Sequence, residues 1–272
     1  MAGLVTFSTD YGYADEFVGV CKLIIAKIAP NVRVIDVVHG IRGIRSGGAI
    51  LAQSLPEGPT AADVDGVVVH LVVVDPEVGT DRRGVVVVCE NGSMLVGPDN
   101  GVFFPVADIF GGPVAANELT EPWFRREDVS YTFHGRDIFA PAAAHLALGR
   151  KPTEFGPKVD PDDLVRVQPP YVARDKGVIQ AEVIRDDWFG NIQLAATRVD
   201  LEAAGLSGQV RVNRYEATIA EKFADVDEGQ MIVYVNSAGQ LAIARNRASA
   251  VEVLGEPEWV SIESPDDVPP AS

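Results

Sequence analysis

Residues 66–80 read GVVVHLVVVDPEVGT, and this stretch decides the predicted fold. A nearly continuous run of valine and leucine is typical of a strand that is covered on both faces, as at the centre of a parallel sheet. The run ends at Asp75, so a carboxylate follows the strand directly. Ligands of open α/β sheets collect beyond the carboxyl ends of strands, and the residues after position 74 are therefore candidates for a binding site.

Around this strand, apolar runs of strand length alternate with helical patterns. We expect strands at residues 4–8, 32–38, 66–74 and 85–89, and helices at 15–28, 47–55 and 136–148. Such alternation predicts a layered α/β domain whose central sheet is mostly parallel. This N-terminal domain is predicted to span residues 1–150.

The pattern changes after residue 150. Residues 151–170 contain five prolines without sustained periodicity and are predicted to be a linker. Short strand-like runs follow, and they predict a small β-rich domain over residues 171–264. These runs lie at 177–184, 209–212, 231–235 and 241–244. Residues 265–272 are predicted to form a tail.

Composition excludes several classes of protein. The chain has 272 residues, 47% of them hydrophobic, which is enough to form a substantial core. Its net charge of −16 would repel nucleic acids and anionic membranes at long range. Two cysteines form neither a disulfide framework nor a zinc site. With no signal peptide or membrane span in the sequence, we expect a cytoplasmic protein with neither nucleic-acid nor membrane partners.

Polar residues follow the first predicted strand, where residues 8–12 read STDYG. A carboxylate such as Asp10 at a strand end could accept two hydrogen bonds from a ribose diol. More often, a carboxylate in such a position caps a helix or braces a turn. The sequence pattern by itself leaves both interpretations of Asp10 open.

Two further clusters follow the central strand and precede the last predicted helix of the domain. Asp75 and Arg82 are seven residues apart across a glycine-containing turn, so they could pair, either at a site or as a structural ion pair. His134 stands at the start of the alanine-rich helix. Its imidazole could exchange protons near neutral pH or simply pack.

Several kinds of chemistry lack support in the sequence. Asp10, Asp15, Asp75 and His134 could converge on a cation, but Arg82 would compete with it, and we predict no metal. Neither a G-x-G-x-x-G loop nor a lysine-containing phosphate loop follows a predicted strand. The chain also lacks a G-x-S-x-G nucleophile turn. Nucleotide phosphates and covalent hydrolysis are therefore not expected.

Taken together, six short motifs in order resemble a known family, the S-adenosyl-L-methionine (SAM) hydroxide adenosyltransferases, relatives of the SAM-dependent fluorinase and chlorinase. The motifs are STDYG at 8–12 with Asp15, VDPEVGT at 74–80 with Arg82 and Arg83, GPDNG at 97–101, FHGRD at 133–137, Asp186 with FGN at 189–191, and NS at 236–237 with ARN at 244–246. The resemblance spans nearly the whole chain.

The resemblance implies a fold and a reaction. It implies an N-terminal α/β domain, a smaller C-terminal β-barrel-like domain, and a homotrimer whose active sites lie between subunits. The implied enzyme is a SAM hydrolase that converts SAM and water into adenosine and L-methionine, with SAM as substrate and no cofactor. A SAM-dependent halogenase and a non-enzymatic adenosine or SAM sensor are the alternatives. The intact triad described next argues against the halogenase.

The resemblance also implies roles for particular residues. The family's water-using triad falls on Asp75, Arg82 and His134. The substrate contacts fall on Asp10 for the ribose, Asp186 for the methionine amino group, Asn191 for adenine, Ser237 for the methionine end, and Arg245 to Arg247 for adenine. One departure from the fluorinase is Ala238, where that enzyme has an arginine, and this puts recognition of the methionine carboxylate in question.

Overall fold

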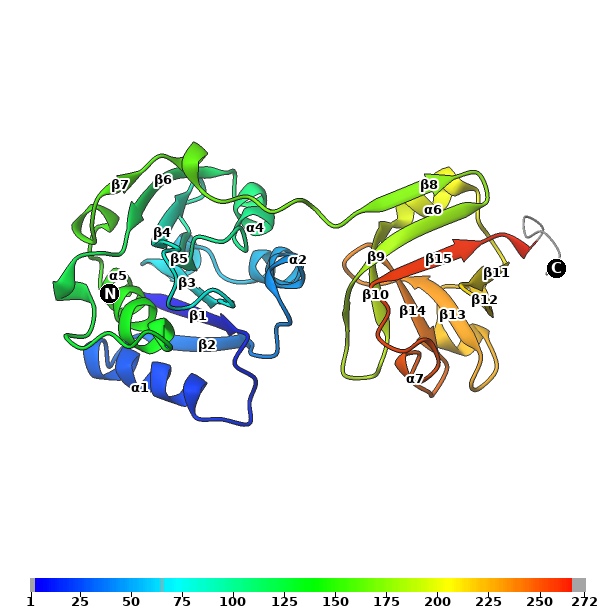
Figure 1. The fold of residues 1–272 in the computed structure, drawn as a ribbon, viewed down its shortest axis with the longest axis horizontal. Helices are drawn as coiled ribbons and strands as arrows, with labels where there is room; N and C mark the ends of the chain where they lie inside the picture. Colours follow the sequence, from blue (N-terminus) through cyan, green and yellow to red (C-terminus); the bar gives the residue numbers. More distant parts are fainter. Residues whose placement is uncertain (1–2, 65, 266–272) are drawn as a thin grey trace. The chain divides into compact units, whose positions relative to one another are not determined.

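The computed structural model describes residues 3–64 and 66–265, and contacts divide the chain into two compact units. The first unit is Met1–Val167 and the second is Gln168–Ser272. Figure 1 shows the elements of each unit, with the first coloured blue to green and the second green to red. The division falls within the proline-rich stretch that the sequence predicted as a linker.

Sheet A of the first unit has the strand order β2-β1-β3-β5-β4-β6-β7 in the described residues. Its strands are β1 Leu4–Thr9, β2 Arg33–Val38, β3 Val68–Val73, β4 Gly84–Cys89, β5 Met94–Pro98, β6 Pro113–Glu118 and β7 Lys158–Val159. Strands β2, β1, β3 and β5 are parallel, whereas β4 runs antiparallel to both of its neighbours. The predicted α/β class is confirmed, with a sheet whose pairings are parallel from β2 to β5 and antiparallel from β5 to β7.

Helices cover both faces of sheet A. The helices are α1 Phe17–Ile28, α2 Ile44–Ser54, α3 Ala61–Val64, α4 Phe104–Ile109 and α5 Ala140–Ala147, with 3₁₀ turns at Leu55–Glu57, Pro122–Phe124, Pro152–Glu154 and Pro161–Asp163. Alternate residues of β3 face opposite cores. Leu71 packs in the core that contains α1 and α5, and Val72 packs in the core that contains α2 and α4.

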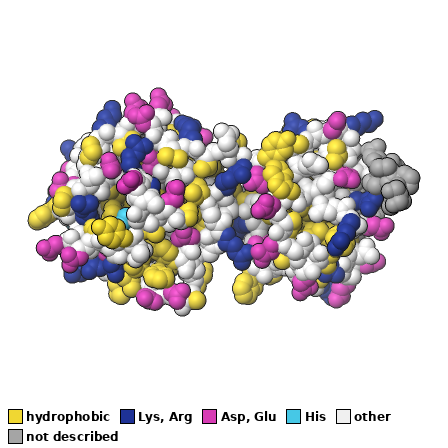
Figure 2. Space-filling model, in the orientation of Figure 1, with side chains coloured by type: hydrophobic (Ala, Val, Ile, Leu, Met, Phe, Trp, Pro, Cys, Tyr) yellow, Lys and Arg dark blue, Asp and Glu magenta, His cyan; other side chains and the backbone are white. Residues whose placement is uncertain are grey.

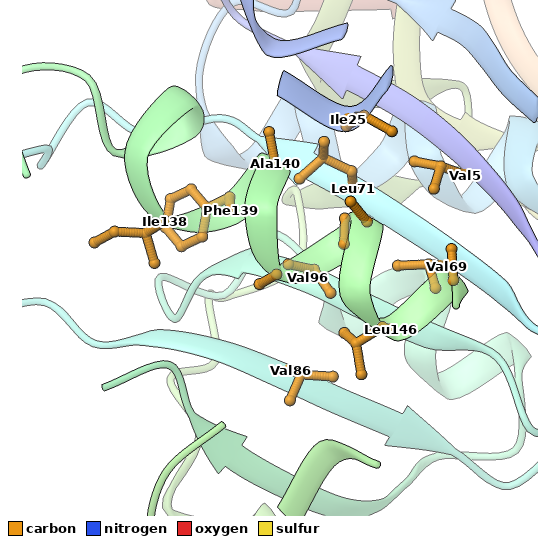
Figure 3. Packing of buried hydrophobic residues seen from close by; sticks show 14 of the residues in the cluster. Val5, Ile25, Val69, Leu71, Val86, Val96, Ile138, Phe139, Ala140 and Leu146 are labelled. Carbon is orange, nitrogen blue, oxygen red and sulfur yellow. The ribbon is translucent and has the colours of Figure 1, made fainter. Parts of the chain in front are cut away.

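Figure 3 shows the first of these cores, with Leu71 and Val69 of β3 beside Leu146 of α5. Leu71 and Leu146 are fully buried. Full burial of one leucine stabilises the fold by roughly 1.5–3 kcal/mol. Because β3 is buried on both sides, its end is held rigidly, and Asp75 follows that end by two residues.

The last predicted helix of the first unit differs from expectation in its first turn. The chain forms a π-helical turn at Gly135–Phe139 before α5 begins at Ala140. Pro141 lacks a backbone N–H and cannot continue the regular bonding of an α-helix. The wider turn accommodates this proline and sets the direction in which the segment after His134 runs.

Residues 151–167 belong to the first unit, and some of them pack in its core or pair with its sheet. Phe155 is buried to 1% exposure and lies in the core beside Phe124. Strand β7 pairs with β6 through Val159 and Ala116. The first half of the proline-rich stretch therefore has fixed structure.

The second unit is a closed barrel. Its strands are β8 Val172–Asp175, β9 Val178–Asp186, β10 Ile192–Thr197, β11 Gln209–Val212, β12 Tyr215–Ile219, β13 Met231–Val235, β14 Gln240–Arg245 and β15 Trp259–Glu263. Seven of these strands form the ring β10-β14-β13-β12-β11-β15-β9, which closes because β9 also pairs with β10, and β8 adds to β9. Closure leaves no free edge in the ring. The β-barrel-like domain implied by the family resemblance is confirmed.

Two helices accompany the barrel, α6 Arg198–Ala204 and α7 Val251–Leu254, with a 3₁₀ turn at Phe223–Asp225. Helix α6 begins with a capping box in which Asp200 accepts hydrogen bonds from the backbone and hydroxyl of Thr197. It ends at Gly205, whose φ of 67° is left-handed and suits glycine. Of the predicted tail at 265–272, residues 266–272 lie outside the described residues.

Candidate active site

The ends of β1 and β3 bring the first two sequence clusters together. The two strands pair in parallel up to Thr9 and Val73, so the residues that follow them emerge side by side. The backbone N–H of Asp75 donates to Asp10 Oδ2 at 2.8 Å. Asp10 in turn donates its backbone N–H to the carbonyl of Val73 at 3.1 Å. Two carboxylates therefore stand at one edge of sheet A.

Arg82 pairs with Asp75 through two hydrogen bonds. Its Nε donates to Oδ1 at 2.8 Å and its Nη2 donates to Oδ2 at 2.5 Å. Both side chains are almost completely buried, with exposures of 7% and 4%. A two-point contact of this kind fixes orientation as well as distance.

The turn between Asp75 and Arg82 depends on Gly79. Gly79 has a φ of +84°, and a Cβ at this position would overlap the carbonyl oxygen of Tyr131. Tyr131 belongs to the loop that leads to His134. The glycine thus lets the second and third sequence clusters approach each other closely.

His134 completes a cluster around the Arg82 guanidinium. Nη2 of Arg82 donates to His134 Nδ1 at 2.7 Å. Since a guanidinium has no acceptor, Nδ1 must accept, and the neutral ring then carries its hydrogen on Nε2. Burial, and after it the positive charge of Arg82, hold the pKa of His134 below its ordinary value. His134 is therefore neutral at physiological pH.

One aromatic ring contacts this cluster, and a second contacts the segment that carries His134. The Arg82 guanidinium carbon lies 5.2 Å from the centre of the Phe139 ring. The Tyr11 ring contacts Phe133 at 5.7 Å between centroids, and its hydroxyl occupies the space where a side chain on Gly135 would begin. Sequence reasoning gave Tyr11 and Phe139 no role. The glycine that follows His134 was the available signal for the Tyr11 contact.

Burial also affects Asp10. It raises the pKa of this carboxyl, while the hydrogen bond from the Asp75 backbone partly offsets the rise. A half-buried carboxylate with a raised pKa at a strand end is a candidate contact for a polar ligand.

Asp137 anchors the turn that carries His134. It is fully buried, accepts from Arg136 Nε at 2.7 Å and Nη2 at 2.9 Å, and accepts from the backbone of Ser130 at 2.9 Å. Burial acts to raise the pKa of Asp137, but these hydrogen bonds and the positive charges of Arg136 and Arg126 together hold it below its ordinary value. Asp137 is thus a charged structural anchor of the His134 segment.

In the second unit, Asp186 and Asn191 flank the hairpin between β9 and β10. Asp186 is paired with Ile192, the residue after Asn191. The Asn191 amide donates to Asp187 Oδ2 at 2.8 Å, and the turn passes through Gly190 at a φ of +77°. The structure therefore brings Asp186 and Asn191 to one end of the barrel.

Arg245 lies at that same end and Ser237 at the other. Arg245 ends β14, where its side chain donates to the carbonyls of Gly229 and Ser249 at 3.1 and 3.3 Å. Ser237 lies in the turn that precedes β14. The length of β14, about 17 Å at roughly 3.4 Å per residue, separates them. Arg247 is exposed, and its backbone has a φ of 56°.

Within residues 3–64 and 66–265, no group of three or more His, Cys, Asp or Glu side chains is arranged to hold a metal ion. Among the same residues, no helix is both long enough and apolar enough to cross a membrane.

The fold and the cluster define a class: an α/β protein with an Asp-Arg-His cluster at its strand ends, followed along the chain by a closed β-barrel. Residues 5–156 match the SAM hydroxide adenosyltransferase N-terminal domain, and residues 181–258 match the corresponding C-terminal domain. The chain belongs to the SAM hydroxide adenosyltransferase family.

Individual relatives agree with this assignment. An (R)-S-adenosyl-L-methionine hydrolase of Salinispora tropica is 46% identical over 92% of this chain and 93% of its own length. A fluorinase of an Actinoplanes species is 27% identical over 90% of this chain and 91% of its own length. A crystal structure of a conserved protein from Thermotoga maritima superimposes with a TM-score of 0.83 at 32% identity, covering 96% of this chain and all of the other.

Proposed function

We propose that this protein hydrolyses SAM to adenosine and L-methionine, by attack of an activated water at the ribose C5′. The observation that carries the proposal is the buried Arg82 guanidinium, which contacts both Asp75 and His134 at the end of β3. The 46% identity to a SAM hydrolase supports the same reaction.

The chemistry requires few groups. Attack at C5′ breaks the bond to a sulfonium and releases a neutral thioether, so the leaving group needs no general acid. The catalytic task is to orient one water and accept its proton. A positioned general base contributes typically 10² to 10⁴ in rate.

The hydrogen bonds of the cluster suggest how the task is divided. With Nδ1 of His134 accepting from Arg82, its Nε2–H can donate to the oxygen of the water. The Asp75 carboxylate is then the group that accepts the water's proton. Arg82 holds both partners and keeps them at a fixed separation. Exclusion of bulk water would favour the reaction further, because hydroxide and sulfonium neutralise each other as the bond forms.

We assign the substrate contacts as the family resemblance implies. Asp10 binds the ribose diol through Oδ1, since Oδ2 already accepts from Asp75. Asp186 holds the methionine amino group, while Asn191 and the segment from Arg245 to Arg247 hold adenine. The assignment of Ser237 to the methionine end rests on the resemblance alone, because Ser237 lies at the other end of β14 from Arg245. We further propose a homotrimer whose sites combine both units from different subunits, in the cytoplasm, with no metal, cofactor, nucleic acid or membrane partner.

The name of the Salinispora relative specifies the (R) configuration at the sulfonium. We propose the same preference here. Inverting the sulfonium exchanges its methyl group with the methionine arm, so contacts that hold both adenosine and methionine accept one epimer only. The (R) epimer should therefore be hydrolysed and the (S) epimer left largely intact.

The test is incubation with each SAM epimer in ¹⁸O-labelled water, with and without fluoride or chloride. Direct attack at C5′ predicts adenosine labelled at the 5′ oxygen, in equal amount whether or not halide is present. A 5′-halogenated nucleoside would show a halogenase instead. Binding without any product from either epimer would show a sensor.

A further inference from the structure

Asp99 and Asn100 follow β5 directly and lie between the two chain segments that carry Asp75 and Arg82. Both are buried, with exposures of 5% and 3%. They belong to the GPDNG motif at residues 97–101, which has no catalytic or binding role in the proposed reaction. Buried polar side chains need hydrogen-bond partners, and the partners found here are neighbours of the catalytic pair.

Asn100 holds the end of β3. Its Nδ2 donates to the carbonyl of Val74 at 2.8 Å, and its Oδ1 accepts from the backbone of Val102 at 3.2 Å. Backbone pairing between β3 and β5 extends only as far as Leu71 and Val96. The Asn100 side chain therefore bonds to the strand beyond its last ladder pair, at the residue immediately before Asp75.

Asp99 holds the other side of the turn. Its backbone N–H donates to the carbonyl of Arg83 at 2.9 Å, and its Oδ2 accepts from Arg83 Nε and Nη2 at 2.9 and 2.7 Å. Oδ1 accepts from the backbone of Val165 at 2.9 Å. Arg83 is the residue immediately after Arg82, so Asp99 restrains the backbone from which the catalytic guanidinium extends.

We propose that Asp99 and Asn100 are positioning residues that hold Asp75 and Arg82 in register by fixing their chain neighbours Val74 and Arg83. This inference rests on the proposed function only for its kinetic consequence. The turn between Asp75 and Arg82 is mostly exposed. Its own hydrogen bonds are short-range, such as the one that the backbone N–H of Thr80 donates to the carbonyl of Glu77. Two adjacent side chains just after β5 fix both ends of that turn.

The expected size of the effect follows from geometry. Asp75 and Arg82 share two short hydrogen bonds, which a small relative shift of the two backbones would break. A misplacement of about 1 Å can reduce a rate by about 10²-fold. Affinity for SAM should change little, because neither Asp99 nor Asn100 is assigned a contact with the substrate.

The first test is Asn100→Ser. A serine hydroxyl can still accept from the Val102 backbone, but it is too short to reach the Val74 carbonyl. We expect kcat to fall about 10- to 100-fold while KM for SAM stays within about 3-fold. The matched control is Asn117→Ser, since Asn117 is also buried, in β6, and donates to the Gly156 carbonyl at 3.0 Å. That variant should keep both constants within about 3-fold.

A second pair of variants keeps the proposal testable should Asn100→Ser not fold. The Arg83 side chain is 34% exposed, so it can be changed with less risk to folding. Arg83→Gln should lower kcat. Arg83→Lys should keep much of the wild-type kcat, because the lysine restores a positive charge beside the Asp99 carboxylate. Asp200→Asn is the control, because it weakens a similar pair with Arg174 in the second unit.

A third readout needs no turnover. The charge of Arg82 lowers the pKa of His134, so displacement of the guanidinium should raise it, while Asp75 and Asp137, which act in the opposite sense, remain in every variant. Nuclear magnetic resonance titration should show this rise in Asn100→Ser and Arg83→Gln only. If His134 titrates as in the wild type, or if Asn117→Ser loses as much kcat, the positioning role is wrong. A wild type that releases no adenosine would instead overturn the proposed function.

Discussion

At the scale of single residues, Arg82 is the side chain on which the proposed mechanism depends, because it touches both Asp75 and His134. Arg82→Lys keeps the charge but loses the planar two-point contact, and lysine cannot donate to both partners in the same geometry. We expect kcat to fall at least about 10²-fold with SAM affinity nearly unchanged. Adenosine release followed by chromatography and SAM binding by calorimetry give the two numbers.

The same measurement separates catalysis from binding for Asp75→Asn and His134→Ala. Because the two side chains act on one water through one guanidinium, the double variant should lose much less than the product of the single losses. Losses of SAM affinity as large as the losses of rate would make these residues substrate contacts.

His70 provides a prediction about stability. It is buried in β3, where its Nδ1 lies 2.8 Å from Thr6 Oγ1, and burial lowers its pKa to about 4. As the pH falls, His70 of the unfolded chain binds a proton near pH 6.5, whereas His70 of the folded chain binds one only near pH 4. The free energy of unfolding therefore decreases as the pH falls from 6.5 towards 4. The loss should reach roughly 3 kcal/mol by the lower end.

Urea unfolding at pH 7 and pH 4.5 measures this loss. His70→Gln can still bond to Thr6 but does not titrate, so its free energy of unfolding should depend less steeply on pH over this interval. An equally steep decline in the variant would assign the acid sensitivity to other groups.

At the scale of elements, the segment Gly135–Phe139 controls where His134 lies. Gly135→Ala would place a Cβ against the Tyr11 hydroxyl and 3.1 Å from its Cζ. The segment must then shift, taking His134 with it, and we expect kcat to fall about 10-fold or more. Tyr11→Phe removes the hydroxyl and leaves the 3.1 Å contact with Cζ, which a small shift of the ring relieves, so the double variant should recover part of the rate.

Kinetics of the two single variants and the double variant test this coupling. A double variant no faster than Gly135→Ala would show that the hydroxyl is not what the glycine accommodates. Gly19→Ala serves as a comparison, because Gly19, like Gly135, has no positive φ but has no atoms near its missing Cβ.

Elements differ in how well their sequence predicts them. The run that forms β3 is apolar except for His70, so burial on both faces and the carboxylate at its end could be predicted. Strands β5 and β6 could not, because Gly97, Pro98 and Pro113 interrupt or begin them with residues that strands usually avoid. Long-range pairing overrides these local preferences, as when the carbonyl of Val72 occupies the space beside Gly97.

The site shows the same division. That Asp75, Arg82 and His134 meet follows from strand ends and a family resemblance, and the structure brings them within hydrogen-bonding distance. The tautomer of His134 and the roles of Tyr11 and Asn100 require knowledge of which atoms face each other. Those contacts join residues 26 to 124 positions apart, and no sequence periodicity reports them.

At the scale of the whole molecule, the acidic net charge does not identify a ligand. Figure 2 shows acidic and basic side chains interspersed on the visible face, so the charge of −16 is not collected there into one patch. This distribution is typical of a surface that maintains solubility. We therefore assign recognition of a cationic substrate to individual groups such as Asp186, the proposed contact of the methionine amino group.

The final prediction concerns assembly. Each unit has a hydrophobic core of its own, and the proposed site residues are divided between the units, with the catalytic His134 in the first and the substrate contact Asn191 in the second. If one site takes its two halves from different subunits, a His134→Ala chain and an Asn191→Ala chain can complement each other. Random mixing in a trimer leaves about one interface in four with both halves intact. Each variant alone should be nearly inactive, whereas the mixture, after subunit exchange verified by native mass spectrometry, should approach a quarter of wild-type activity. Activity that stays at the level of the separate variants in a fully exchanged mixture would mean that each site is built within one chain.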